Sequence, residues 1–169
     1  MAKFLKIGTS GLVAEESTVT AGGGANANKI PALDSNGQLA ESMMPSGIGA
    51  DTVVVPTSEN LSANEMVNLY NNSGAITARK ADAGTNKYQA NGYVKASTTA
   101  PANATIFLDG TCPGTFAATD AGKPVFLSDT AGTTTLTPVS GSGKLHQLIG
   151  YVTSTTGFDF EVESPIELA

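Results

Sequence analysis

Short apolar and β-branched runs, separated by turn residues at regular intervals, fill the chain from residue 51 onward. Residues 52–55 form one such run and end at Pro56. The runs at 65–70 and 75–80 are separated by "NNSG", whose asparagines and glycine tolerate positive φ, so they predict a hairpin. Short strands at this spacing are typical of a sandwich or a barrel.

Three further pairs of runs follow the same pattern. Residues 92–97 and 104–110 are joined by the turn-rich "TTAPAN". Residues 123–128 and 133–138 are joined by "DTAG", where Gly132 supplies the turn position. Residues 144–154 and 158–163 are joined by "TTG". We therefore expect an antiparallel arrangement of eight or nine strands with little helix.

The last of these runs, "FDFEVE", alternates strictly between apolar and acidic residues. A strand with this pattern has one apolar face, Phe158, Phe160 and Val162, and one acidic face, Asp159, Glu161 and Glu163. Burying each apolar side chain contributes about 1.5–3 kcal/mol, whereas an exposed ion pair contributes about 0–1 kcal/mol. The apolar face is therefore expected in the core and the acidic face in solvent.

The first fifty residues have a different pattern and are expected to form an extended arm. Turns are predicted at Gly8 to Gly11 and at Asn36-Gly37, and a helical turn at residues 40–44. The segment "KIPALDSNGQLAESMMPSGIGAD" has apolar residues at neither helical nor strand spacing. These apolar side chains need a surface to cover them, provided either by the chain's own β-domain or by a neighbouring subunit. The chain is thus predicted to be mainly β, with an extended N-terminal arm (1–50) followed by an antiparallel β-sandwich or barrel (51–169).

Composition narrows the range of functions. Only 14% of the residues are charged, and nine basic residues against fifteen acidic ones give a net charge of −6. Nucleic acid is not expected as a partner, because phosphate binding requires clustered Lys and Arg. The nearest approach to a cluster, Arg79 and Lys80, has Asp82 close by and is interpreted as a solvated strand end.

No pattern of catalytic or metal-binding residues is evident. The single cysteine, Cys112, and the single histidine, His146, do not supply the ligands that a zinc site needs. The "GGGANA" stretch lacks the strand and helix of a dinucleotide-binding motif, and no apolar run approaches a membrane span. We expect no enzymatic activity, no cofactor, no metal and no membrane partner.

The segment at 29–51, with its "ALD-NG-L" and "P-GIGAD" elements, is similar to a segment of structural proteins of tailed bacteriophages. "ENLSANEMVNLYNNSGAITARKADA", "ANGYVKAS", "GKPVFLSDTAGTTTLTP" and "KLHQLIGYVTSTTGFDFEVESPIELA" resemble the β-rich module that follows it, so the resemblance covers residues 29–169. It implies a capsid decoration (cement) protein that binds the outer surface of the assembled shell as a homotrimer and stabilises it. Its partners would be the major capsid protein and further copies of the chain, and assembly would take place in the cytoplasm of the bacterial host.

The resemblance also suggests contact residues. The capsid contact is expected at Phe4, Leu5 and Ile7. The inter-subunit contact is expected at Ile30, Leu33, Leu39, Met43 and Met44. Because such modules also occur in fibres, the alternative is a head-fibre or tail-fibre module that recognises a host surface glycan, and a more remote one is an enzyme acting on host polysaccharide.

Overall fold

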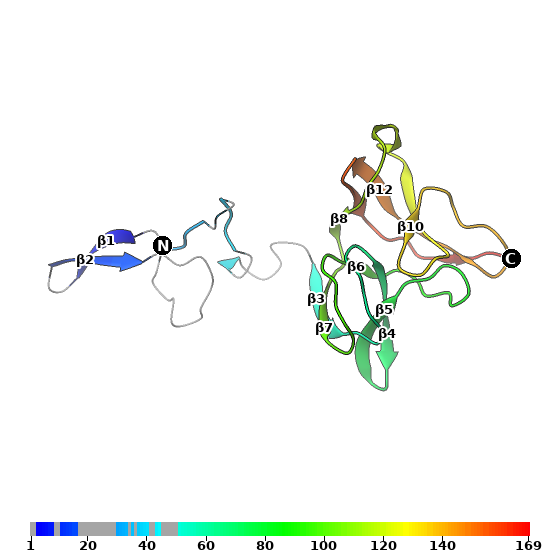
Figure 1. Ribbon diagram of the computed structural model, residues 1–169, viewed down its shortest axis with the longest axis horizontal. Helices are drawn as coiled ribbons and strands as arrows, with labels where there is room; N and C mark the ends of the chain where they lie inside the picture. The colour runs from blue at the N-terminus through cyan, green and yellow to red at the C-terminus, as the bar shows by residue number, and fades with distance from the viewer. Residues whose placement is uncertain are drawn as a thin grey trace. The chain divides into compact units, whose positions relative to one another are not determined.

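The structure is a computed structural model that describes residues 3–8, 11–16, 30–33, 35, 37–40, 43–44 and 51–169 (Figure 1). It divides into two units, Met1–Gly49 and Ala50–Ala169. The strands pair antiparallel throughout the sheets, which confirms the predicted mainly β fold.

The first unit contains a hairpin. Strands β1 (Lys3–Gly8) and β2 (Gly11–Glu16) pair in a register that places Gly8 opposite Gly11, where the sequence predicts a turn. Gly37 has a φ of +77°, in agreement with the second predicted turn, while Asn36 lies outside the described residues. The amide of Met43 donates to the Ala40 carbonyl (2.9 Å), which forms a single turn at the predicted place.

In the second unit, five strands form a sheet in the order β3-β7-β6-β4-β5. Its strands are β3 (Thr52–Pro56), β4 (Met66–Asn72), β5 (Ala75–Lys80), β6 (Gly92–Val94) and β7 (Asn103–Phe107). The two edge strands approach each other, because Thr57 bridges to Ala78 and the Ser58 amide donates to the Ala78 carbonyl (3.0 Å). The sheet therefore curls toward a small barrel. It encloses an apolar cluster, the barrel core: Val55, Leu61, Val67, Ala78, Val94, Ala104 and Ile106.

A second five-stranded sheet has the order β10-β9-β12-β13-β8. Its strands are β8 (Gly110–Pro113), β9 (Pro124–Leu127), β10 (Thr134–Thr135), β12 (Leu148–Ser154) and β13 (Gly157–Phe160). A two-stranded sheet pairs β11 (Leu145–His146) with β14 (Ile166–Glu167), and one 3-10 turn, η3, spans Ala118–Asp120.

A larger apolar cluster, the interlayer core, combines residues of both five-stranded sheets. Met66 and Tyr93 come from the curled sheet, whereas Val125, Ile149 and Phe158 are among those from the second sheet. Because side chains alternate along a strand, β4 contributes Met66 to the interlayer core and Val67 to the barrel core. The predicted alternatives, sandwich and barrel, are thus combined: a curled sheet with its own core carries a second sheet packed on its outside.

The four predicted strand pairs are all present: β4 with β5, β6 with β7, β9 with β10, and β12 with β13. The first connection is tighter than predicted, since β4 continues to Asn72 and only Ser73 and Gly74 form the turn. More strands are present in the second unit than expected. The strands β8, apart from Gly110, and β14 lie outside the predicted runs, and the predicted run 144–154 is divided into β11 and β12.

Two predictions about side chains are wrong. Val162 is 37% exposed, because β13 ends at Phe160 and the alternation does not continue as a strand. The prediction holds for Phe158 and Phe160, which are buried, and for the acidic residues, which are exposed.

Arg79 and Lys80 are half-buried and do not form a solvated strand end. The Arg79 guanidinium carbon lies 4.0 Å from the ring centroid of Tyr70 and 3.3 Å from that of Tyr88. The Lys80 ammonium pairs with Glu65 at 2.8 Å. Local sequence could not reveal these partners, because Tyr88 and Glu65 come from other segments of the chain.

Candidate functional site

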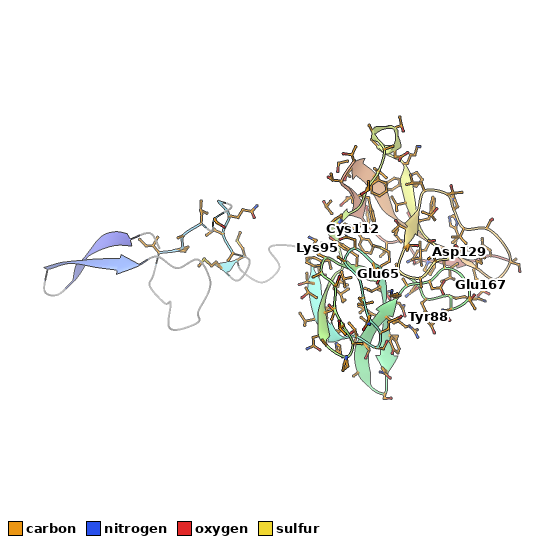
Figure 2. The ribbon with its side chains drawn as sticks, viewed as in Figure 1. Glu65, Tyr88, Lys95, Cys112, Asp129 and Glu167 are labelled. Atoms are coloured by element: carbon orange, nitrogen blue, oxygen red, sulfur yellow. The ribbon has the colours of Figure 1, made fainter. Side chains whose placement is uncertain are left out.

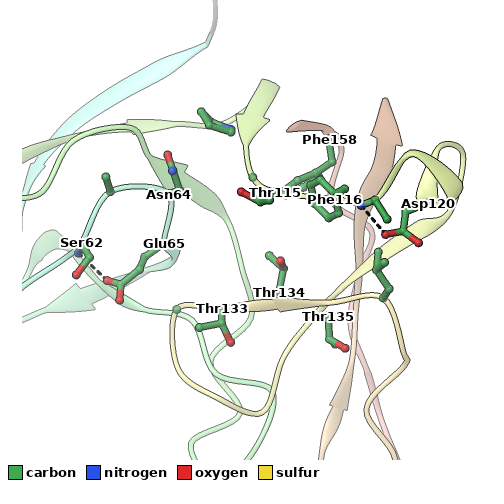
Figure 3. A pocket seen from close by; sticks show the side chains of 16 residues that line it. Ser62, Asn64, Glu65, Thr115, Phe116, Asp120, Thr133, Thr134, Thr135 and Phe158 are labelled. Carbon is green, nitrogen blue, oxygen red and sulfur yellow. Dashed lines mark hydrogen bonds between the residues drawn. The ribbon is translucent and has the colours of Figure 1, made fainter. Parts of the chain in front are cut away.

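A pocket of about 590 Å³ opens on the second unit (Figure 3). Three segments that are distant in sequence form its walls: residues 62–65 before β4, residues 113–117 after β8, and residues 132–136 around β10. Since β8 and β10 are the two edge strands of the second sheet, the pocket lies where that sheet has unpaired edges.

The first wall is a tight loop with an unusual backbone. Asn64 has a φ of +69°, the left-handed region that few residues other than glycine adopt. Its amide donates to the Val94 carbonyl (2.7 Å), which holds the loop against β6. Glu65 fixes the other side, since its carboxylate accepts from the Ser62 amide (2.8 Å) and from the Lys80 ammonium (2.8 Å). The loop is therefore rigidly placed by the fold.

The opposite wall is partly aromatic. Phe116 packs edge-on against Phe158, with ring centroids 6.1 Å apart, and its amide donates to the Thr155 carbonyl (3.0 Å). Beyond it, Asp120 accepts hydrogen bonds from the Lys123 ammonium (2.8 Å) and the Ala117 amide (2.9 Å). These bonds, with that from Lys123 first, lower the pKa of the Asp120 carboxyl below its ordinary value. The carboxylate is thus charged and already paired.

Four polar side chains of the pocket have no partner within the described part of the protein: those of Ser62, Asn64, Thr115 and Thr134. The neighbouring threonines differ, because Thr133 donates to the Thr130 carbonyl (2.9 Å) and Thr135 to the Thr137 carbonyl (3.1 Å). Figure 3 shows Thr134 rising from β10 into the space between Glu65 and Phe116. The pocket therefore offers three hydroxyls and one amide whose hydrogen-bonding capacity is unused by the protein.

The contact residues expected from the sequence lie in the first unit, away in sequence from this pocket. Ile30, Leu33, Leu39 and Met44 are 52%, 58%, 40% and 40% exposed, and Met43 is half-buried. Phe4, Leu5 and Ile7 lie on β1, opposite Glu15, Ala14 and Leu12 in the register, and their side chains are outside the described set. The capsid and inter-subunit contacts stay predictions.

Other candidate chemistry of the sequence has structural roles here. His146 packs against the Phe126 ring, with centroids 5.1 Å apart. Cys112 is fully buried in the interlayer core (Figure 2). In the part of the chain that the structure describes, no group of three or more His, Cys, Asp or Glu side chains is arranged to hold a metal ion. Among the same residues, no helix has the length and apolar character to cross a membrane.

Comparison of the chain with protein-family models, with curated proteins and with solved structures finds no match. The functional inference therefore comes from the residues of the chain itself and from the phage resemblance of its motifs.

Proposed function

We propose that this protein is a non-enzymatic decoration (cement) protein of a tailed bacteriophage. It binds the outer surface of the assembled capsid as a homotrimer and stabilises the shell. The arm residues make the contacts: Phe4, Leu5 and Ile7 bind the major capsid protein, and Ile30, Leu33, Leu39, Met43 and Met44 bind neighbouring copies of the chain.

The observation that carries this proposal is the exposure of the apolar arm residues. Ile30 and Leu33 are more than half exposed in the single chain, at 52% and 58%. Burial of each such side chain contributes about 1.5–3 kcal/mol, so a partner surface that covers them gains substantial free energy. The β-domain buries two apolar clusters of its own, and it also leaves Val54, Ile76 and Ile166 exposed, at 62%, 59% and 64%.

A protein of this kind acts by mass action. It binds the closed shell and not the dissociated capsomers, and its binding free energy is added to the stability of the assembled state. A closed trimer presents three copies of the same contact surface, which suits bridging between adjacent capsomers. No chemical step is required for this activity.

Full-length variants test the two contact surfaces separately. Leu33→Asp places a charge in the proposed inter-subunit contact and should give a monomer by light scattering. Leu5→Asp should leave the trimer mass unchanged but abolish co-sedimentation with shells of the phage that encodes the chain. Ile76→Asp is the matched control, because Ile76 is also exposed (59%) but lies on β5.

If both arm variants trimerise and bind shells as the unchanged protein does, the proposal is wrong. Immuno-electron microscopy of the virion separates it from the fibre alternative. A decoration protein is labelled over the whole capsid surface, whereas a fibre module is labelled only on projecting fibres.

A further inference from the structure

We propose that the pocket between residues 62–65, 113–117 and 132–136 is a binding site for a neutral carbohydrate, a short oligosaccharide segment. This inference rests on the β-domain alone and does not depend on where the protein sits on a virion. Four features of the pocket lead to it: its unused polar groups, its charge balance, its aromatic wall and its size.

The unused polar groups match a polyhydroxylated ligand. A threonine hydroxyl both donates and accepts, and an asparagine amide offers one acceptor oxygen and two donor hydrogens. Asn64, Thr115 and Thr134 come from three different wall segments of the same pocket. Sugar hydroxyls are likewise donors and acceptors, and each of these side chains can bind one in either direction.

The charge balance disfavours an anionic ligand. No Lys or Arg is among the residues that line the pocket, and both lining carboxylates are already paired with lysines, Glu65 with Lys80 and Asp120 with Lys123. A phosphate or carboxylate would therefore meet acidic groups and no free cation. A sugar hydroxyl can instead donate to a carboxylate oxygen, because each carboxylate has about four acceptor positions and these two use only some of them.

The volume of the pocket and its apolar lining also suit a carbohydrate ligand. A volume of about 590 Å³ lies within the range of roughly 300–1,000 Å³ that is usual for ligand pockets. The Phe116 ring lies in one wall and the Leu136 side chain in another, and both are half-buried. They provide apolar surface against which the C–H face of a sugar ring can pack.

An extended peptide is the rival occupant, because β8 and β10 are open sheet edges. Strand addition depends on a row of main-chain hydrogen bonds. Here β10 has only two residues, and β8 ends at Pro113, which has no N–H to donate. The edges beside the pocket thus give an added strand few hydrogen bonds, whereas the unpartnered Thr134 side chain extends into the pocket (Figure 3).

Two variants remove ligand groups and leave the fold intact. Thr134→Val is isosteric and deletes one unpaired hydroxyl. Asn64→Gly deletes the amide side chain, and glycine adopts the φ of +69° at this position without strain, so folding is not compromised. Thr105→Val is the matched control, because Thr105 is an exposed strand residue of β7 that does not line the pocket.

The experiment screens the purified full-length protein against an array of neutral oligosaccharides built from glucose, galactose, mannose and N-acetylhexosamines. Positive ligands are then titrated by saturation-transfer NMR. We expect binding that each pocket variant weakens by about three- to tenfold, the effect of one hydrogen bond, while Thr105→Val leaves the affinity unchanged.

The proposal is overturned if no neutral oligosaccharide binds, or if Thr134→Val and Thr105→Val bind a positive ligand equally well. It is also overturned if a strand-forming peptide binds at the β10 edge and the sugars do not. Its failure is distinct from failure of the decoration proposal, because Asn64→Gly and Thr134→Val should still sediment with shells and Leu33→Asp should still bind the sugar.

Discussion

At the scale of single residues, the charged side chain of Arg79 packs against two aromatic rings. Its guanidinium lies within 4.0 Å of two tyrosine ring centroids, and its Nε donates to the Asn68 side chain (2.9 Å). Rings of that size cannot both cover one face of the cation, so the guanidinium is held between Tyr70 and Tyr88. A planar, delocalised cation suits such a stack, whereas an ammonium does not.

We therefore expect Arg79→Lys to lower the free energy of unfolding by about 1 kcal/mol. Urea denaturation followed by circular dichroism measures the change. Lys87→Met is the control, because it removes only the exposed ion pair with Glu167 and should cost at most about 0.5 kcal/mol. Equal losses in the two variants would show that the stack contributes no more than an ordinary surface charge.

Cys112 gives a prediction about pH. Burial raises the pKa of its thiol from 9.0 to about 12, because a thiolate would lose its hydration between the sheets; Lys95 opposes this only in part. In the unfolded chain the thiol has its ordinary pKa. Above that value, the unfolded state loses a proton that the folded state retains, so stability falls as the pH rises toward the folded pKa. The free energy of unfolding then decreases by at most about 1.4 kcal/mol per pH unit.

Urea unfolding of the unchanged protein and of Cys112→Ala between about pH 8 and 11 tests this linkage. The stability advantage of the unchanged protein should shrink with rising pH. Tyr93, whose pKa burial also raises to about 12, is present in both proteins. Because the charge of Cys112 raises the Tyr93 pKa further, the difference between the two proteins reports on the thiol together with its coupling to Tyr93. Two curves that stay parallel across this range would contradict the prediction.

At the scale of elements, two positions with positive φ require glycine for different reasons. Gly74 (φ +94°) completes the two-residue turn between β4 and β5, and an added Cβ would meet nothing within 4 Å. Gly150 (φ +147°) lies at an irregularity of β12, where an added Cβ would be 1.8 Å from the Asp159 carbonyl oxygen on β13. One position needs glycine for its dihedral angle, and the other also needs it for space.

Alanine at the two positions should therefore have unequal effects. Gly74→Ala is expected to cost about 1 kcal/mol, the penalty for a Cβ at a left-handed φ. Gly150→Ala is expected to cost at least about 3 kcal/mol, because the strand pairing must distort to admit the methyl group. Chemical denaturation of both variants decides this, and losses of similar size would refute the role given to the β12–β13 contact.

The hairpins were predictable because their information is local. "NNSG" and "DTAG" place turn residues between runs of strand formers, and the structure pairs both sets of runs. The curl of the first sheet was not predictable, since it depends on the contact between Thr57 and Ala78, twenty-one positions apart and with no motif at either site. Turn chemistry thus predicts neighbouring strands, but not which edges meet.

The pocket was missed for the same reason. Its walls come from residues 62–65, 113–117 and 132–136, and only the fold brings them together. Asn64 gave no local sign of its positive φ, since asparagine is common in turns of every kind. The run "TTTLTP" predicts a strand, but which of its hydroxyls stays unpaired depends on the backbone carbonyls of the folded chain.

At the scale of the whole β-domain, the two apolar clusters share the strands that separate them. On β4, Met66 belongs to the interlayer core and Val67 to the barrel core, and on β6 Tyr93 and Val94 divide in the same way. If one of these strands loses its contacts in one core, its contacts in the other core are disturbed as well. We therefore expect residues 51–169 to unfold in a single cooperative transition.

Leu127→Ala tests this coupling, because Leu127 is fully buried in the interlayer core and lies on β9, a strand with no member in the barrel core. The truncation should cost about 2–5 kcal/mol. Native-state hydrogen exchange should then show the same loss of protection for amides of β3 and β7 as for those of β9 and β12, because all of them open through one global unfolding event. Ile106→Ala in the barrel core is the reciprocal variant and should lower protection in β9 and β12. Amides of β3 and β7 that keep their original protection in Leu127→Ala would show instead that the barrel and the second sheet unfold independently.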